Sequence, residues 1–197
     1  NIGYIYYGSF SDNFGDSNLD QIISRMSICK GIIIDIRNNG GGYLTNADKL
    51  AARFFASKTL VGYIRHKTGK GHSDFSDPYP IYEEPSKRIN FLEKPVAVLT
   101  NRSCFSSAND FVNSMRYAQN AIVIGDNTGG GSGLPFSSEL PNGWSVRFSS
   151  SPMTNAKDQQ IEFGIAPDYK VDMTEQDIQK GLDTIIEKAR QVINSKS

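Results

Sequence analysis

Apolar residues form two kinds of run along the chain, short continuous runs and runs with helical spacing. The continuous apolar runs at 31–37 and 95–100 are typical of strands buried inside a sheet. Strands are predicted over residues 2–7, 31–37, 59–64, 95–100 and 121–125. Between and after them, apolar residues recur at the spacing of one helix face, over residues 18–29, 45–55, 106–117 and 174–193. Strands that alternate with helices predict an α/β fold with a mainly parallel sheet flanked by helices.

The segments between these runs complete the predicted organisation. Two helices begin with a pattern that resembles a capping box, Thr45 with Asp48 and Thr174 with Asp177. Residues rich in Gly, Ser, Pro and charge predict a long excursion over 68–92, and two late strands are expected at 144–148 and 160–163. No repeat or hinge-like linker divides the sequence, so we expect residues 1–197 to form one domain.

Three loops follow predicted strands and carry small or polar residues. They cover residues 38–42, 102–107 and 127–133. In a parallel α/β sheet, the carboxyl ends of the strands share one edge, and ligands bind along that edge. The topology therefore predicts that the three loops converge on one site.

Charge and length exclude two classes of partner. The 21 basic residues equal the 21 acidic ones, and the chain lacks the basic face that nucleic acid requires. The longest apolar runs are too short to cross a bilayer. The chain has no initiator Met and starts directly in a predicted strand, so we expect it to be a fragment of a longer protein.

Cysteine and histidine give no sign of a metal or a disulfide. Cys29 precedes one predicted strand and Cys104 follows another, so in neighbouring parallel strands the two thiols lie at opposite ends of the sheet. Free, buried thiols are the expectation. His66 and His72 lie outside any metal-like spacing and are interpreted as exposed or capping residues, with a role as general base left as a minor alternative.

The glycine run Gly40–Gly42 has three interpretations. It can cradle a phosphate, but the G-x-G-x-x-G pattern is incomplete because Thr45 stands where its third glycine belongs. It can simply permit a tight turn. It can also point backbone N–H groups at an anion that forms only during a reaction. No cofactor is expected.

The joint between the strand at 95–100 and the next helix concentrates small side chains, namely Ser103, Cys104, Ser106 and Ser107. A serine at this place is commonly an N-cap, but four such residues exceed what one cap requires. The start of a helix also stabilises negative charge. We therefore consider Ser106 as a nucleophile, with the N–H groups of Ser107 and of Gly40 or Gly41 forming an oxyanion hole.

Four ordered motifs then resemble one known family. The segments 31–42, 98–111, 123–131 and 163–168 together look like the C-terminal-processing and tricorn-core family of serine peptidases. The resemblance implies a core of the crotonase and Clp-protease type. It also implies hydrolysis of peptide bonds through an acyl-enzyme.

The resemblance assigns two residues directly. The family nucleophile falls on Ser106. The loop 128–132 contains no Lys, which disfavours the Ser/Lys branch, whereas Glu162 matches the late glutamate of the tricorn-like branch. Without the resemblance, Glu162 also fits a solvated strand residue. The upstream histidine, the helical part and the PDZ domain of the family have no counterpart in this sequence, so the general base is expected from an upstream segment.

The sequence therefore favours the catalytic core of a serine endopeptidase that acts on peptide or protein substrates. The family implies a location outside the cytoplasm, in the bacterial periplasm or cell envelope. The alternative from another class is a non-catalytic module that binds peptides or apolar ligands on the same fold. A crotonase-type acyl-CoA enzyme would require a nucleotide-binding surface, and the sequence shows none.

Overall fold

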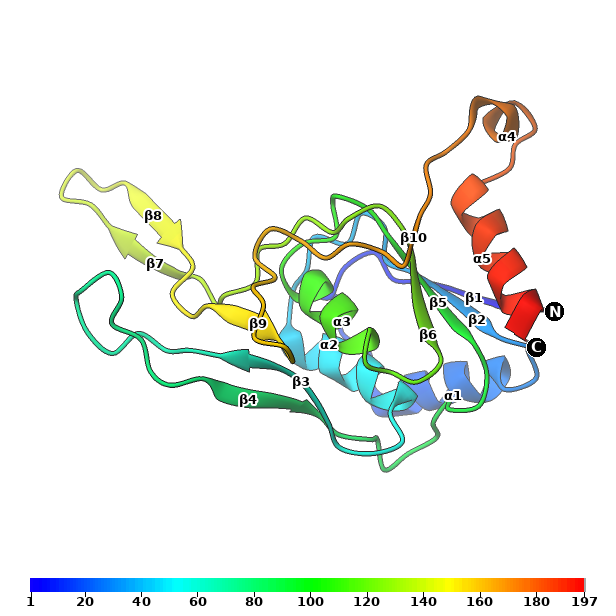
Figure 1. Ribbon diagram of the computed structural model, residues 1–197, viewed down its shortest axis with the longest axis horizontal. Helices are drawn as coiled ribbons and strands as arrows, with labels where there is room; N and C mark the ends of the chain where they lie inside the picture. Colours follow the sequence, from blue (N-terminus) through cyan, green and yellow to red (C-terminus); the bar gives the residue numbers. More distant parts are fainter. Residues whose placement is uncertain (197) are drawn as a thin grey trace.

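A five-stranded parallel sheet forms the centre of the protein, as the computed structural model of residues 1–196 shows (Figure 1). In spatial order its strands are β1 (Gly3–Tyr6), β2 (Ile32–Asp35), β5 (Val96–Thr100), β6 (Ala121–Gly125) and β10 (Tyr169–Lys170). Every neighbouring pair runs parallel. β2 and β5 are buried at every position, which explains their uninterrupted apolar runs. The predicted parallel sheet flanked by helices is confirmed.

Helices cover both faces of this sheet and create two hydrophobic cores. One face packs against α1 (Asp16–Met26), α2 (Leu44–Ala51), the single 3-10 turn η1 (Ala52–Phe54) and α3 (Ser107–Met115). The other face packs against α5 (Thr184–Lys196). Side chains alternate between the two cores along β2, because Ile32 and Ile34 join the first core and Ile33 joins the second. Both faces of the central strands β2 and β5 are therefore buried.

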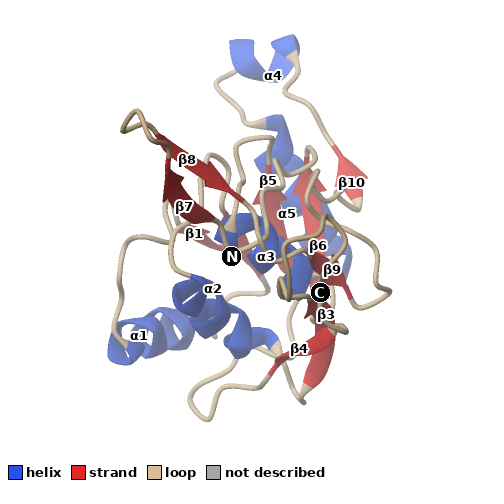
Figure 2. Cartoon of the chain, turned by 90° about the vertical axis from the view of Figure 1, so that its left-hand side faces the viewer, coloured by secondary structure: helices blue, strands red, loops and turns tan. Residues whose placement is uncertain are grey.

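Two smaller β structures extend from this body. An antiparallel sheet contains β4 (Tyr79–Glu83), β3 (Thr59–Ile64) and β9 (Met153–Asn155), so the predicted strand 59–64 lies outside the parallel sheet. A hairpin of β7 (Phe136–Glu139) and β8 (Ser145–Phe148) projects from the body, and Figure 2 shows it standing apart from α1 and α2. Within residues 1–196, no helix is long and apolar enough to cross a membrane.

Several predicted elements differ from the structure. The excursion 68–92 contains the strand β4, and the predicted strand 160–163 is wrong, because Gln160 forms only an isolated bridge with Thr154 before the chain turns. The last predicted helix divides into α4 (Glu175–Gln179) and α5. The break is at Gly181, whose φ of +69° is not helical.

The two predicted helix caps have different outcomes. The hydroxyl of Thr174 accepts a hydrogen bond from the Asp177 N–H at 3.2 Å, which confirms this cap. The cap at Thr45 is wrong, since α2 begins one residue earlier and its N-cap is Tyr43, which caps through no side chain. The Tyr43 N–H is tied to the Phe10 carbonyl instead, and this contact fixes where the helix starts.

Both cysteines are free and buried, as predicted. Cys29 lies before β2, whereas Cys104 lies after β5, so the two thiols are at opposite ends of parallel neighbours.

Candidate active site

The loops that follow β2, β5 and β6 meet at the carboxyl edge of the sheet. A Cβ atom on Gly41 would lie 2.8 Å from the Ser106 Cβ and 2.7 Å from the Phe105 carbonyl oxygen, so only glycine permits this approach. The Ser106 N–H donates to the Gly130 carbonyl at 2.8 Å, and Phe105 forms a bridge with Gly130. The predicted convergence of the three loops is confirmed.

Ser106 adopts a backbone conformation that is rare for any residue but glycine, with φ of 57° and ψ of −128°. It is the N-cap of α3, yet its side chain makes no cap hydrogen bond. Its carbonyl instead accepts the N–H groups of Asn109 and Asp110 at 2.7 and 3.1 Å. Such strain persists only where surrounding contacts impose it, and it is frequent at active sites. The Ser106 hydroxyl is therefore not engaged in capping and is available for chemistry.

Ser106 faces a cleft of about 550 Å3 that also receives the glycine loop and the late glutamate. The lining residues come from all three loops, from the turn at Glu162 and from the β7–β8 hairpin: Gly40, Gly42, Phe105, Ser106, Gly131, Pro135, Arg147, Phe148, Ser149 and Glu162. The hairpin thus forms one wall of the cleft. The structure brings three of the sequence-predicted residues, Ser106, Gly40 and Glu162, into one concave site.

Two backbone N–H groups near Ser106 have no hydrogen-bond partner among residues 1–196, those of Ser107 and Gly40. Ser107 is the first residue of α3, where the helix dipole favours negative charge. The Gly41 N–H, by contrast, donates to the Asn39 Oδ1 at 2.9 Å and is occupied. Gly41 therefore allows the glycine loop to lie close to Ser106. The N–H groups of Ser107 and Gly40 remain free to donate hydrogen bonds to an oxyanion.

The position of Glu162 is set by the loop after β6. Its carbonyl accepts the Gly131 N–H at 2.9 Å, and a Cβ on Gly130 would collide with the same carbonyl oxygen. Burial raises the pKa of the Glu162 carboxyl, and the Ser149 hydroxyl partly opposes this shift by favouring the charged form. A carboxylate that is only partly hydrated is suited to orient a neighbouring base.

Asn39 is a functional residue that the sequence did not single out. It is fully buried, and its Nδ2 donates to the Tyr7 carbonyl at 2.9 Å, while its Oδ1 accepts the Gly41 N–H. Its own carbonyl accepts the Phe105 N–H at 3.1 Å. The side chain of Asn39 therefore links the β1 end to the glycine loop, and its backbone carbonyl adds the serine joint. The signal in the sequence was two asparagines before three glycines, a pattern with many other uses.

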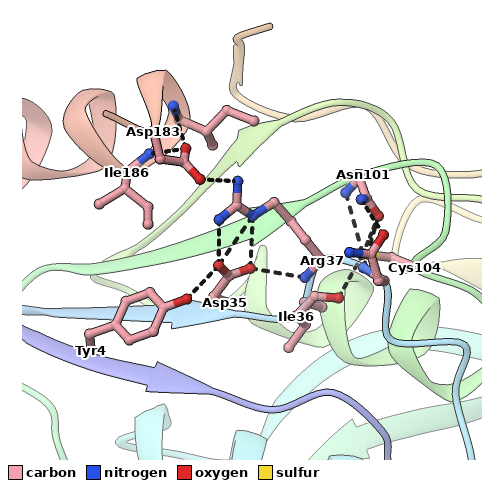
Figure 3. A network of polar contacts seen from close by, with 10 residues as sticks. Tyr4, Asp35, Ile36, Arg37, Asn101, Cys104, Asp183 and Ile186 are labelled. Carbon is pink, nitrogen blue, oxygen red and sulfur yellow. Dashed lines mark hydrogen bonds and ion pairs between the residues drawn. The ribbon is translucent and has the colours of Figure 1, made fainter. Parts of the chain in front are cut away.

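A polar network holds the chain just before this loop (Figure 3). Arg37 makes a bidentate pair with the buried Asp35 and reaches Asp183 at the start of α5 at 2.8 Å. The Tyr4 hydroxyl donates to Asp35 at 2.8 Å, and burial raises the pKa of Tyr4 to about 12. The network anchors the end of β2, from which the glycine loop departs.

Cys104 has a structural role in the same region. Its Sγ donates to the Ile36 carbonyl at 3.0 Å, and burial raises the pKa of the thiol to about 11. A thiol that stays protonated at neutral pH is a poor nucleophile. Of the side chains at this joint, the Ser106 hydroxyl is therefore the candidate nucleophile.

A buried hydrogen-bond network of polar side chains connects α3 to the loops around it. The Thr128 hydroxyl donates to the Asn109 Oδ1 at 2.6 Å and accepts the Ile165 N–H at 2.7 Å. The Asn109 Nδ2 donates to the Ser132 hydroxyl at 2.8 Å. Because every partner is distant in sequence, no local sequence pattern could have predicted this hydrogen-bond network.

Among residues 1–196, no histidine or lysine lines the cleft. The His66 ring packs against Tyr79, 5.7 Å between centroids, and its Nδ1 lies 3.5 Å from the Ser151 hydroxyl. His72 is exposed. The described residues also contain no cluster of three or more side chains that could hold a metal ion.

Comparisons with known proteins identify the family of the chain. The profile of Peptidase family S41 matches residues 1–171. The carboxy-terminal processing protease CtpA of Bacillus subtilis is 25% identical over 175 residues, which cover 88% of this chain and 35% of CtpA. The chain thus spans about one third of the length of this relative.

Solved structures show the same fold. The crystal structure of a candidate peptidase from Parabacteroides merdae has a TM-score of 0.94 at 53% identity, and the match covers 98% of this chain and 61% of that one. Mature CPAF, solved in complex with lactacystin, has a TM-score of 0.83 at 19% identity, covering 98% of this chain and 52% of CPAF. At that identity the likeness to CPAF concerns the fold.

Proposed function

Because the chain belongs to peptidase family S41, we propose that residues 1–197 form the catalytic core of a longer serine endopeptidase, which cleaves peptide or protein substrates through an acyl-enzyme on Ser106. The observation that carries the proposal is the strained Ser106, which opens a helix and shares one cleft with Gly40 and Glu162. A hydroxyl held at the N-terminus of a helix, beside unoccupied backbone donors, is the arrangement that acyl transfer requires.

In the proposed reaction, the Ser106 Oγ attacks the carbonyl carbon of the scissile bond, and its proton passes to a general base. The N–H groups of Ser107 and Gly40 stabilise the oxyanion of the tetrahedral intermediate. When the C–N bond breaks, the base returns the proton to the leaving amine, and water later releases the acyl group by the same route.

The base in this proposal comes from a segment outside residues 1–197. The support is that no histidine or lysine among the described residues lines the cleft, whereas Glu162 does line it. Glu162 orients the base and stabilises its protonated form, as a carboxylate does in a catalytic triad. We further propose, from the resemblance to the family, that upstream helical and PDZ domains belong to the same protein, and that it works outside the cytoplasm, in the periplasm or cell envelope.

A fluorophosphonate probe applied to the full-length protein tests the assignment. We expect one modified serine, Ser106, and complete loss of labelling in Ser106→Ala. Ser103→Ala is the matched control, because Ser103 is an exposed hydroxyl in the same joint and should leave labelling unchanged. Labelling that persists in Ser106→Ala would show that the nucleophile is another residue.

The alternative function, a non-catalytic module that binds peptides or apolar ligands, is favoured by one observation, the lack of a base in the described part of the cleft. Measurement of peptide hydrolysis by the full-length protein separates the two functions. Turnover that depends on Ser106 excludes the binding module, and peptide binding without turnover supports it.

A further inference from the structure

A second cavity of about 210 Å3 lies beside the cleft, and we propose that it binds the lysine or arginine side chain of a peptide substrate, next to the scissile bond. The inference rests on the proposed function and names its substrate class. The cavity lies between α2, α3 and the sheet formed by β4, β3 and β9, and apolar side chains dominate its walls.

The cavity is lined by segments that also contribute to the site around Ser106. Three short segments line both spaces: Gly42 and Leu44, Ser106 and Asp110, and Pro135 and Leu134. Asp110 lies one helical turn after Ser106 on α3, and its N–H donates to the Ser106 carbonyl at 3.1 Å. A substrate residue held at Ser106 therefore has this cavity as its neighbour.

Three carboxyl groups that the proposed reaction does not use line this cavity, those of Asp48, Glu83 and Asp110. Neither lysine nor arginine lines it, and none of the three acids forms an ion pair within the described residues. Glu83 is only 6% exposed, with the Ser114 hydroxyl as its polar neighbour. A buried carboxylate without a cation is costly, and a bound cation would remove that cost.

An amide group is a further polar component of the cavity wall. Asn113 lines the cavity, is 7% exposed, and donates through its Nδ2 to the Val61 carbonyl at 2.8 Å. Its Oδ1 accepts no hydrogen bond from any described residue. This oxygen is open to solvent-accessible space, so it is an additional acceptor for a ligand that donates hydrogen bonds.

Lysine and arginine match this combination of apolar walls and acceptor groups. Their charged ends donate several hydrogen bonds and accept none, and their long aliphatic stems pack against apolar surface. The volume corresponds to about seven waters, enough for one long side chain. An inorganic cation matches less well, because no group of side chains in the described part of the chain is arranged to ligate a metal.

Cleavage of matched peptides by the full-length protein tests the inference. The peptides differ only at the residue before the scissile bond, which is lysine, arginine or the uncharged norleucine. We expect kcat/KM to be at least about tenfold higher for lysine and arginine than for norleucine, and Glu83→Gln to lower this ratio about tenfold. Glu84→Gln is the control, because Glu84 is exposed, pairs with Lys58 and should leave the ratio unchanged.

Each outcome decides the inference separately from the proposed function. Cleavage without preference for the basic residues, or a ratio that Glu83→Gln does not change, overturns the inference and leaves the peptidase intact. If Glu83→Gln does not fold, Asp110→Asn carries the same expectation, because this carboxyl also lines the cavity and is shielded from solvent. If no peptide is cleaved, the proposed function fails, and an NMR titration then decides the binding question. Nα-acetyl-lysine amide should bind more tightly than its norleucine analogue and lose this advantage in Glu83→Gln, and equal or absent binding overturns the inference.

Discussion

At the scale of single residues, Ser106 combines backbone strain with chemistry. The sequence showed four small residues at one joint, and the resemblance to a family selected Ser106 among them. The positive φ of Ser106 could not have been predicted, because the residues that impose it, Gly41 and Gly130, are distant in sequence. A serine kept in this conformation indicates that its side chain has a function which offsets the strain.

Replacing Ser106 should therefore separate strain from chemistry. Ser106→Ala keeps the Cβ atom and the strain, whereas Ser106→Gly relieves strain of about 1–3 kcal/mol and adds a smaller entropic cost. We expect both variants to be inactive and Ser106→Gly to be more stable than Ser106→Ala by about 1 kcal/mol. Urea denaturation measures the difference, and equal stability of the two variants would mean that the backbone at this position is relaxed.

Glu83 should make stability depend on pH. Burial raises the pKa of Glu83 to about 7, from an ordinary value of 4.5. Between these two values the folded protein binds more protons than the unfolded chain, so the free energy of unfolding falls as the pH rises and is constant above about 7.

The Glu83→Gln variant should lose this part of the pH dependence. From pH 5 to pH 8, the wild-type protein should lose on the order of 2 kcal/mol more stability than the variant. Denaturant unfolding at both pH values provides the measurement. A parallel decline in the two proteins would place the Glu83 carboxyl in a solvated environment.

At the scale of elements, the glycine loop after β2 depends on the approach of two backbones. The sequence predicted the loop and left its role open between a phosphate cradle, a tight turn and an oxyanion hole. In the structure, Gly41 has a φ of +99° and a Cβ on it would lie 2.8 Å from the Ser106 Cβ, so this position requires glycine. The Gly40 N–H has no partner among the described residues, which supports the proposed oxyanion hole. The loop is held in place by Asn39, whose hydrogen bonds to Tyr7 and Phe105 join segments that the sequence could not show to be neighbours.

Two adjacent glycines should respond differently to an added methyl group. Gly41→Ala places a Cβ atom 2.7 Å from the Phe105 carbonyl oxygen, so we expect a loss of stability of more than about 2 kcal/mol and no measurable peptidase activity. Gly40→Ala is the matched comparison, because a Cβ there has no atom within 4 Å and should change stability by less than about 1 kcal/mol. Thermal unfolding of both variants gives the answer, and similar melting temperatures would show that the loops do not approach as closely as described.

At the scale of the whole molecule, the buried strands and the shared edge of the sheet were predictable. Continuous apolar runs identified β2, β5 and β6, and parallel topology then placed their loops together. The strands β4, β7, β9 and β10 were missed, because they are short or polar and obtain their stability from pairing with distant partners. The wall that the hairpin adds to the cleft was missed for the same reason.

The cavity beside the cleft also belongs to this scale. It is built from two helices and a separate sheet, and its acids come from α2, β4 and α3. Individually, Asp48, Glu83 and Asp110 look like ordinary surface charges in the sequence. Only their arrangement around one space gives them a shared role.

The central claim is that Ser106 and the backbone donors around it form one oxyanion site. A crystal structure of the full-length protein after reaction with a fluorophosphonate tests this claim most directly. We expect phosphorus bonded to the Ser106 Oγ and one phosphonyl oxygen within about 3 Å of the Ser107 and Gly40 nitrogens. A phosphonyl oxygen that points to solvent, or an adduct on another serine, would contradict the account.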